Sequence, residues 1–309
     1  PCLVIDADGR VWWAQPTDSG DPFVFTLDDA GLPRASGLSG ARVAAGLGHP
    51  EGTGQFVALL GEKSGVMFVF VGRAGRRPIA GVGRYDLTGD RVTILHDTAA
   101  LEQATGLSAA LVLARMDLLP GEPPTLWVRD LDRSIMLSVG GTVPQRRMDR
   151  LLDDAGAPVG GRGPEMSATL LGRRLTLLDP LAGRLYRIGD AAQLVPLQAL
   201  HEDCDYPANL ASVRVDGAEW AIVATVRRPP ERARRLGMGM PIDPGFALPA
   251  MVLSDGRTQR VIDRAALRLP PGVPPDLLHP TRLAGAPDGT SFLLYDANTG
   301  QLLRGTPAP

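Results

Sequence analysis

One short pattern recurs six times along this chain of 309 residues: an apolar strand, a tight turn and a second apolar strand. The second strands are centred at successive intervals of 56, 59, 49, 45 and 72 residues. The six copies cover residues 3–14, 55–71, 110–130, 168–179, 211–225 and 282–296. A pattern that repeats at such a period indicates stacked units, none of which is stable alone.

The turns inside this pattern favour β-hairpins. Asp-Gly pairs at positions 8–9, 216–217 and 288–289 each separate two apolar runs. Such pairs suit two-residue hairpins because Gly adopts positive φ without steric cost. Most copies are followed by two further strands. We therefore predict an all-β fold: a six-bladed β-propeller of mostly four-stranded antiparallel blades around a central axis, with residues 1–309 forming a single domain.

The sixth copy is incomplete, because only residues 301–304 follow it as a further strand. Either the N-terminal segment supplies the missing strand, or this blade has three strands. The first alternative is favoured because it would pair an open sheet edge. Helical turns are expected in the connections at 97–105, 148–154 and 263–269.

Composition excludes some partners. A net charge of −2 argues against nucleic acid or an anionic membrane surface as the main partner. No apolar run reaches 18 residues, so no transmembrane span is predicted. Cys2 and Cys204 could form one disulfide or remain two buried thiols, and both alternatives stay open.

All four histidines fall at the same phase of the repeat. His49, His96, His201 and His279 each lie in a connection that leads from one blade to the next. Such connections emerge on one face of a propeller, where imidazoles could form a metal or acid–base site. Alternatively, histidines collect there because long polar connections face water.

The densest polar cluster covers residues 201–209 and contains His201, Asp203, Asp205 and Asn209. Carboxylate and amide oxygens suit Ca²⁺ or another divalent cation. A carboxylate beside other carboxylates could also act as a general base. The alternative is an acidic turn that faces water.

The same region carries a resemblance to a known group of proteins. Tyr-Pro-Ala-Asn-Leu at 206–210, followed by Asp-Gly-Ala-Glu-Trp-Ala at 216–221, resembles a segment of strictosidine-synthase-like proteins. These are relatives of the SMP-30/gluconolactonases and the paraoxonases. Residues 281–304 resemble a blade of the same group. The resemblance covers about two blades and implies a six-bladed propeller, an axial divalent cation, usually Ca²⁺, and hydrolysis of lactones or esters.

The resemblance transfers few site residues. Asn209 matches a family ligand, and Glu51 is similar in placement to another, whereas Ala208 stands where the family has Asp. The chain has only two Asn residues, so a site built from several amides cannot form in the usual way. From the residues and the resemblance together, we expect metal ligation by Glu51, Asn209 and Asp205, and proton transfer by His201, Asp203 and His49.

Two functions follow from this sequence. The first is a propeller with an axial pocket that handles a small molecule, of lactonase or esterase ancestry, with metal-assisted hydrolysis. The alternative is a non-catalytic module that binds a protein partner at its axial face or serves in assembly. The sequence contains no GxSxG elbow and no P-loop. Trp12, Trp127 and Trp220 are expected to pack between blades.

Overall fold

The computed structural model describes residues 2–16, 20–28, 30–108, 111–130, 133–152, 167–171, 174–179, 183–189, 192–200, 206–226, 250–263, 268, 280–296 and 301–307. The chain forms two compact units. The first comprises Pro1–Gly163 with Asp190–Gln193, and the second comprises Pro164–Gly189 with Leu194–Pro309. Among the residues described, none of the helices is both long enough and apolar enough to span a membrane.

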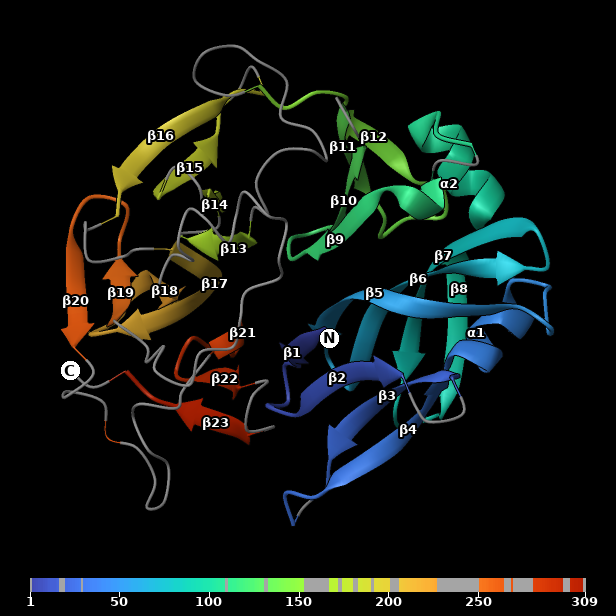
Figure 1. Cartoon of the computed structure of the whole chain (residues 1–309), viewed down its shortest axis with the longest axis horizontal. Helices are drawn as coiled ribbons and strands as arrows, with labels where there is room; N and C mark the ends of the chain where they lie inside the picture. The colour runs from blue at the N-terminus through green and yellow to red at the C-terminus, as the bar shows by residue number, and fades with distance from the viewer. Residues whose placement is uncertain are drawn as a thin grey trace, which may run out of the picture. The chain divides into compact units, whose positions relative to one another are not determined.

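Each unit contains three antiparallel sheets, which Figure 1 shows in chain order from blue to red. The first unit's sheets are β1 (Leu3–Ile5), β2 (Val11–Pro16), β3 (Pro22–Leu27) and β4 (Pro33–Ser39); β5 (Thr53–Glu62), β6 (Gly65–Ala74), β7 (Arg77–Asp86) and β8 (Arg91–His96); and β9 (Arg115–Leu119), β10 (Thr125–Asp130), β11 (Arg133–Ser138) and β12 (Gln145–Met148). The second unit's sheets are β13 (Ser167–Leu171), β14 (Arg174–Asp179), β15 (Arg184–Ile188) and β16 (Leu194–Ala199); β17 (Tyr206–Val215), β18 (Ala218–Val226), β19 (Ala250–Ser254) and β20 (Gln259–Asp263); and β21 (Pro280–Gly285), β22 (Phe292–Asp296) and β23 (Gln301–Gly305).

The order of the strands confirms the predicted fold class. Every sheet pairs its strands in sequence order. Within each unit the first strands of successive sheets are neighbours, since β5 lies beside β1 and β9, and β17 lies beside β13 and β21. Six sheets built in this way are the blades of a six-bladed β-propeller.

Strand β6 shows why the sequences of such strands are continuous apolar runs. Successive side chains of a strand point to opposite faces. Phe68 and Phe70 belong to the core shared with the first sheet, whereas Met67 and Val69 belong to the core shared with the third sheet. Both faces are buried, and full burial of each such side chain contributes roughly 1.5–3 kcal/mol.

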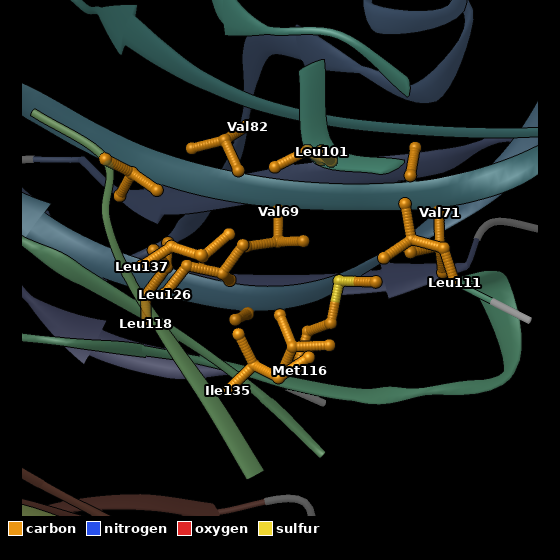
Figure 2. Close-up of a cluster of buried hydrophobic side chains, with 14 of the residues drawn as sticks. Val69, Val71, Val82, Leu101, Leu111, Met116, Leu118, Leu126, Ile135 and Leu137 are labelled. Carbon is orange, nitrogen blue, oxygen red and sulfur yellow. The ribbon is translucent and has the colours of Figure 1, made fainter. Parts of the chain in front are cut away.

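The core between the second and third sheets is drawn in Figure 2. Val69 and Val82 of the second sheet meet Leu126 and Leu137 of the third, and Leu101 of helix α2 (Thr98–Thr105) closes one side. This core has no charged member among the described residues, so its stability comes from apolar burial and close packing.

The helices agree with the sequence only in part. The expected helix at 97–105 is α2, which begins where the Asp97 carboxylate accepts the Ala100 N–H at 2.9 Å. The helix expected from residue 148 is wrong over 148–152, where Leu152 instead forms an isolated bridge with Gln193. Helix α1 (Gly40–Gly46), capped by Ser39, was not predicted, because its two glycines lower the helix propensity of a short segment with a buried apolar face. A 3₁₀ turn, η1 (Leu111–Leu113), precedes β9.

The sixth sheet contains three strands among the residues described. Strand β1 pairs with β2 in the first sheet, with Val4 opposite Trp12. The expectation that the N-terminal segment completes the sixth sheet is therefore wrong, because this segment is the first strand of its own blade.

The tryptophans and turns follow the sequence predictions. Trp12, Trp127 and Trp220 are buried, as expected for packing residues. Asp216 and Gly217 have φ of 51° and 77°, so both central residues of this hairpin turn are left-handed. Cys2 Sγ lies 3.7 Å from the Phe56 carbonyl oxygen, and Cys204 lies outside the described residues.

Candidate functional site

The first two sheets have two chemically different ends. At the hairpin end lie the β1–β2, β3–β4, β5–β6 and β7–β8 turns; at the connection end, residues 40–52 lead from β4 to β5. Hydrogen bonds join the turns of the hairpin end to one another. The Asp8 carboxylate accepts the Ser64 N–H at 3.0 Å, and the Ser64 carbonyl accepts the Leu87 N–H at 3.0 Å.

His49 and Glu51 lie at the connection end, in the turn between α1 and β5. The His49 N–H donates to the Ala44 carbonyl at 2.8 Å, and the His49 carbonyl accepts the Gly52 N–H at 2.8 Å. The His49 side chain is half-buried and that of Glu51 is exposed. Neither side chain makes a hydrogen bond or ion pair within the described part of the chain, so both are available to a ligand.

His96 is a structural residue rather than a member of an open site. It ends β8, is only 1% exposed, and its Nε2 lies 3.0 Å from the Val139 carbonyl oxygen. A carbonyl only accepts, so Nε2 carries the proton, and the buried Nδ1 has no hydrogen-bond partner within the described ranges. This imidazole fastens the second sheet to the residue after β11. The sequence offered two alternatives for this histidine: a place on a face with a metal or acid–base site, or a place in a polar connection that faces water. The buried His96 fits neither of them.

The remaining sequence candidates belong to the second unit. His201, Asp203 and Asp205, and also His279, lie outside the described residues. Asn209 lies in β17, whose pairing with β18 shifts register between Pro207 and Asn209. A bulge of this kind redirects side chains and is common beside functional sites. In the portion described, no group of three or more His, Cys, Asp or Glu residues could hold a metal ion.

A cavity of about 540 Å³ lies at the hairpin end, between the first and second sheets. We call it the blade-1/2 cavity. The first sheet contributes Arg10, Thr26 and Arg34, and the second contributes Tyr85 and Asp90. The cavity and the pair His49 and Glu51 therefore lie at opposite ends of the same two sheets.

The strand register explains why two arginines meet at this cavity. Residues directly opposite one another in antiparallel strands share a face. Trp12 pairs with Thr26, and Thr26 pairs with Arg34, so the three lie in one row on the face toward the second sheet. Arg10 precedes Trp12 by two positions and follows the same alternation. Trp12 in turn meets Tyr85 edge-on, with ring centroids 6.1 Å apart.

A hydrogen-bond network, here called the Tyr85 latch, closes the cavity wall. Tyr85 Oη donates to Asp90 Oδ1 at 2.9 Å and accepts the Gly37 N–H at 2.9 Å. Arg42 Nη1 lies 2.8 Å from Asp90 Oδ1 and donates to the Gly37 carbonyl at 2.5 Å. Gly37 is required here, since a Cβ at this position would lie 1.8 Å from Asp90 Oδ1.

The electrostatics of the latch follow from these contacts. The Arg42 hydrogen bond, with that from Tyr85, lowers the pKa of Asp90 below its ordinary value. Burial raises the pKa of Tyr85, so the phenol stays neutral at physiological pH. The latch therefore combines a carboxylate, a guanidinium and a neutral hydroxyl.

The two arginines that line the cavity differ from a third arginine in the core. Arg129 is buried, pairs with Asp117, and its guanidinium carbon lies 4.1 Å from the Trp127 ring centroid. By contrast, the Arg34 side chain makes no hydrogen bond or ion pair in the described ranges. Within the described residues, the Arg10 side chain has only the Asp8 carboxylate as a partner, with Oδ2 at 4.0 Å. Arg129 is thus already neutralised, whereas the cavity arginines remain open to a ligand.

Sequence reasoning missed this cavity. Its members come from separate hairpin turns, and each turn is ordinary when taken alone. One signal was available: Arg10, Trp12, Thr26 and Arg34 fall on one face once the strands are paired in register. This shared face can be recognised only once the strand register is known. Tight turns determine that register more strongly than composition does.

Comparisons with known proteins support the fold. A structural genomics protein of unknown function from Bacteroides thetaiotaomicron matches 98% of this chain and 68% of its own, with a TM-score of 0.56 and 13% identity. A chain of the mitotic checkpoint complex matches with a TM-score of 0.52 and 10% identity, covering 100% of this chain and 90% of its own. A chain of the nidogen/laminin complex has a TM-score of 0.50 and 13% identity, with coverages of 96% and 89%. At these identities the likeness shows the fold alone.

No protein-family model matches the chain, and no curated protein sequence matches it. The six-bladed propeller fold is established by the order of the strands. The narrower resemblance to the SMP-30 group remains a prediction.

Proposed function

We propose that this propeller binds a small organic molecule in the blade-1/2 cavity. The observation that carries this proposal is the cavity itself, whose volume of about 540 Å³ falls in the range of small-molecule sites, roughly 300–1,000 Å³. Its lining combines the apolar side chain of Leu87 with the arginines and the Tyr85 latch. Convergent polar groups beside apolar surface are typical of such sites.

A ligand screen tests this proposal. Compounds from a library of small organic acids, amides and sugars that bind the folded protein should raise its melting temperature. The gain should disappear in Leu87→Trp, which fills the cavity. The proposal fails if no compound raises the melting temperature, or if Leu87→Trp responds as the wild type does.

A second candidate function is divalent-cation-assisted hydrolysis. The register shift at Asn209 favours it, together with the resemblance to the SMP-30 group. In this proposal Glu51, Asn209 and Asp205 supply the oxygen ligands that Ca²⁺ prefers. The cation would polarise a substrate carbonyl, while His201, Asp203 and His49 move protons.

Melting in Ca²⁺ and in EDTA tests the second candidate. A cation bound to the folded state raises the melting temperature, and Asn209→Ala should remove that shift. Equal melting temperatures in Ca²⁺ and EDTA would count against it. The alternative of a non-catalytic module that binds a protein partner at its axial face or serves in assembly remains a prediction as well.

A further inference from the structure

We propose that the ligand of the blade-1/2 cavity carries an anionic oxygen group, a carboxylate or a phosphate, which Arg10 and Arg34 hold between them. This inference rests on the proposed function, because it assigns a ligand class to the same cavity. It depends on three observations: the placement of the two guanidinium groups, the state of the carboxylates beside them, and an unpartnered hydroxyl.

Strand register places the two arginines on the same face of the first sheet. Arg34 lies opposite Thr26, which lies opposite Trp12, and Arg10 shares the Trp12 face. Both arginines line the cavity, and the Arg10 side chain is 45% exposed. Both groups are therefore solvated in the unliganded protein and accessible to a ligand.

The carboxylates of the cavity are already engaged by the protein. Asp28 Oδ1 accepts the N–H groups of Ala30 and Leu32 at 3.0 and 2.8 Å. Asp90 is held by Arg42 and by the Tyr85 hydroxyl. Arg42 neutralises Asp90, whereas in the described part of the chain Arg34 has no acidic partner and Arg10 has only the Asp8 carboxylate, at 4.0 Å, so both guanidinium groups can attract an anion.

Guanidinium chemistry defines the ligand class. The planar donors of Arg match the oxygen pairs of carboxylate and phosphate, and two arginines together can clamp one such group. Thr26 is 6% exposed, lines the cavity, and its Oγ1 has no hydrogen-bond partner among the residues that the structure describes. The cavity exceeds what a bare inorganic ion occupies and includes the apolar side chain of Leu87, so the ligand is an organic anion with an apolar portion.

Three probes of similar size separate charge from shape. Isophthalate supplies carboxylates, phenyl phosphate supplies a phosphate, and isophthalamide is the neutral analogue of isophthalate. Dissociation constants are measured by ligand-observed NMR with wild type, Arg10→Gln, Arg34→Gln, Leu87→Trp and the control Arg77→Gln. Arg77 is exposed at the start of β7, at the opposite end of the sheet from the cavity. Circular dichroism melting verifies that each variant is folded.

The proposal expects at least one anion to bind wild type and Arg77→Gln equally. Each cavity arginine variant should weaken this binding by roughly tenfold or more, as expected for the loss of a charge-assisted hydrogen bond. Raising the salt concentration from 50 to 500 mM should weaken it further. The stronger of the two anions identifies the preferred oxygen group.

The failures of the two proposals are distinguishable. If isophthalamide binds as well as isophthalate, the arginine variants change nothing and Leu87→Trp abolishes both, the ligand class is wrong and the cavity remains a binding site. If Arg77→Gln weakens the anion as much as Arg34→Gln does, binding is non-specific and the ligand class is again wrong. If neither the probes nor the wider library binds, both proposals fail.

Discussion

The indole Nε1 of Trp12 donates to Asp6 Oδ2 at 2.8 Å, and both side chains are fully buried. The other carboxylate oxygen, Oδ1, accepts the N–H groups of Asp8 and Arg10, each at 2.9 Å. A buried carboxylate is tolerated only when its oxygens have donors, and here both do. The same carboxylate therefore anchors the first sheet's core and shapes the turn that presents Arg10 to the cavity.

Asp6→Asn should lower the free energy of unfolding by about 2–3 kcal/mol. An amide has a single acceptor oxygen, so its NH₂ group would face either the indole donor or the turn's N–H groups. Urea denaturation followed by circular dichroism measures the change. Asp86→Asn, at an exposed turn, is the matched control and should cost less than about 0.5 kcal/mol. Equal losses in the two variants would show that the Asp6 contacts contribute nothing special.

Much of the fold could be predicted from the sequence because its signals are local and repeated. For example, the pair Asp216 and Gly217 predicts a hairpin, because its turn requires a positive φ at both positions. The preference for a sixth sheet completed by the N-terminal segment was wrong, and the alternative of three strands fits the residues described. The Asp-Gly pair at 8–9 is the local signal that the strand at residues 3–5 pairs with β2 in its own blade.

Gly37→Ala should lower the melting temperature by about 3–6 °C. The new Cβ would lie 1.8 Å from Asp90 Oδ1 and 2.5 Å from Arg42 Nη1, so the Tyr85 latch must open to accommodate it. Calorimetry of Gly37→Ala, Asp90→Ala and the double variant measures the coupling. Because Asp90→Ala removes the clashing carboxylate, Gly37→Ala should cost less in that background. Strictly additive losses would contradict this account of the latch.

The latch also predicts an acid dependence of stability. The pKa of Asp90 is lowered in the folded state by Arg42 and then Tyr85, so the ion pair stabilises the fold at pH values above the unfolded pKa, about 3.9. This stabilisation is lost as the pH falls further, through the lowered folded pKa. The difference in melting temperature between wild type and Asp90→Asn should stay constant from pH 7 to about 5 and shrink below about 4. A difference that instead grows on acidification would refute the assignment.

The candidate site was less predictable than the fold. The phase of the repeat correctly places His49 and Glu51 at the entrance to β5, but phase does not determine burial. His96 lies at the same position of the repeat and is nevertheless buried beside Val139, because its strand ends between two packed sheets. The blade-1/2 cavity arises from register across three strands and from the neighbouring sheet, which no single segment encodes.

Thr26→Val should raise the free energy of unfolding by about 1 kcal/mol. The buried Thr26 Oγ1 has no hydrogen-bond partner in the described part of the chain, and Val keeps the shape and the β-branched preference for a strand. Urea denaturation without added ligand measures the gain. Thr258→Val is the control, because Thr258 is exposed and its Oγ1 donates to Asp255 at 3.0 Å. A loss of stability in Thr26→Val would mean that its hydroxyl has a partner in solution.

The prediction that residues 1–309 form a single domain can be tested through the tryptophans. Trp12, Trp13 and Trp127 belong to the first unit and Trp220 to the second, so each unit has its own fluorescence reporter. One variant keeps only Trp220, by Trp→Phe changes at the other three positions, and a second variant carries Trp220→Phe alone. If the chain is one domain, fluorescence and circular dichroism should give a single coincident urea transition in each variant. Because Trp12→Phe also removes the donor to Asp6, that variant's midpoint should be lower, but its two signals should still coincide. Separate midpoints for the two signals within one variant would divide the chain into two domains.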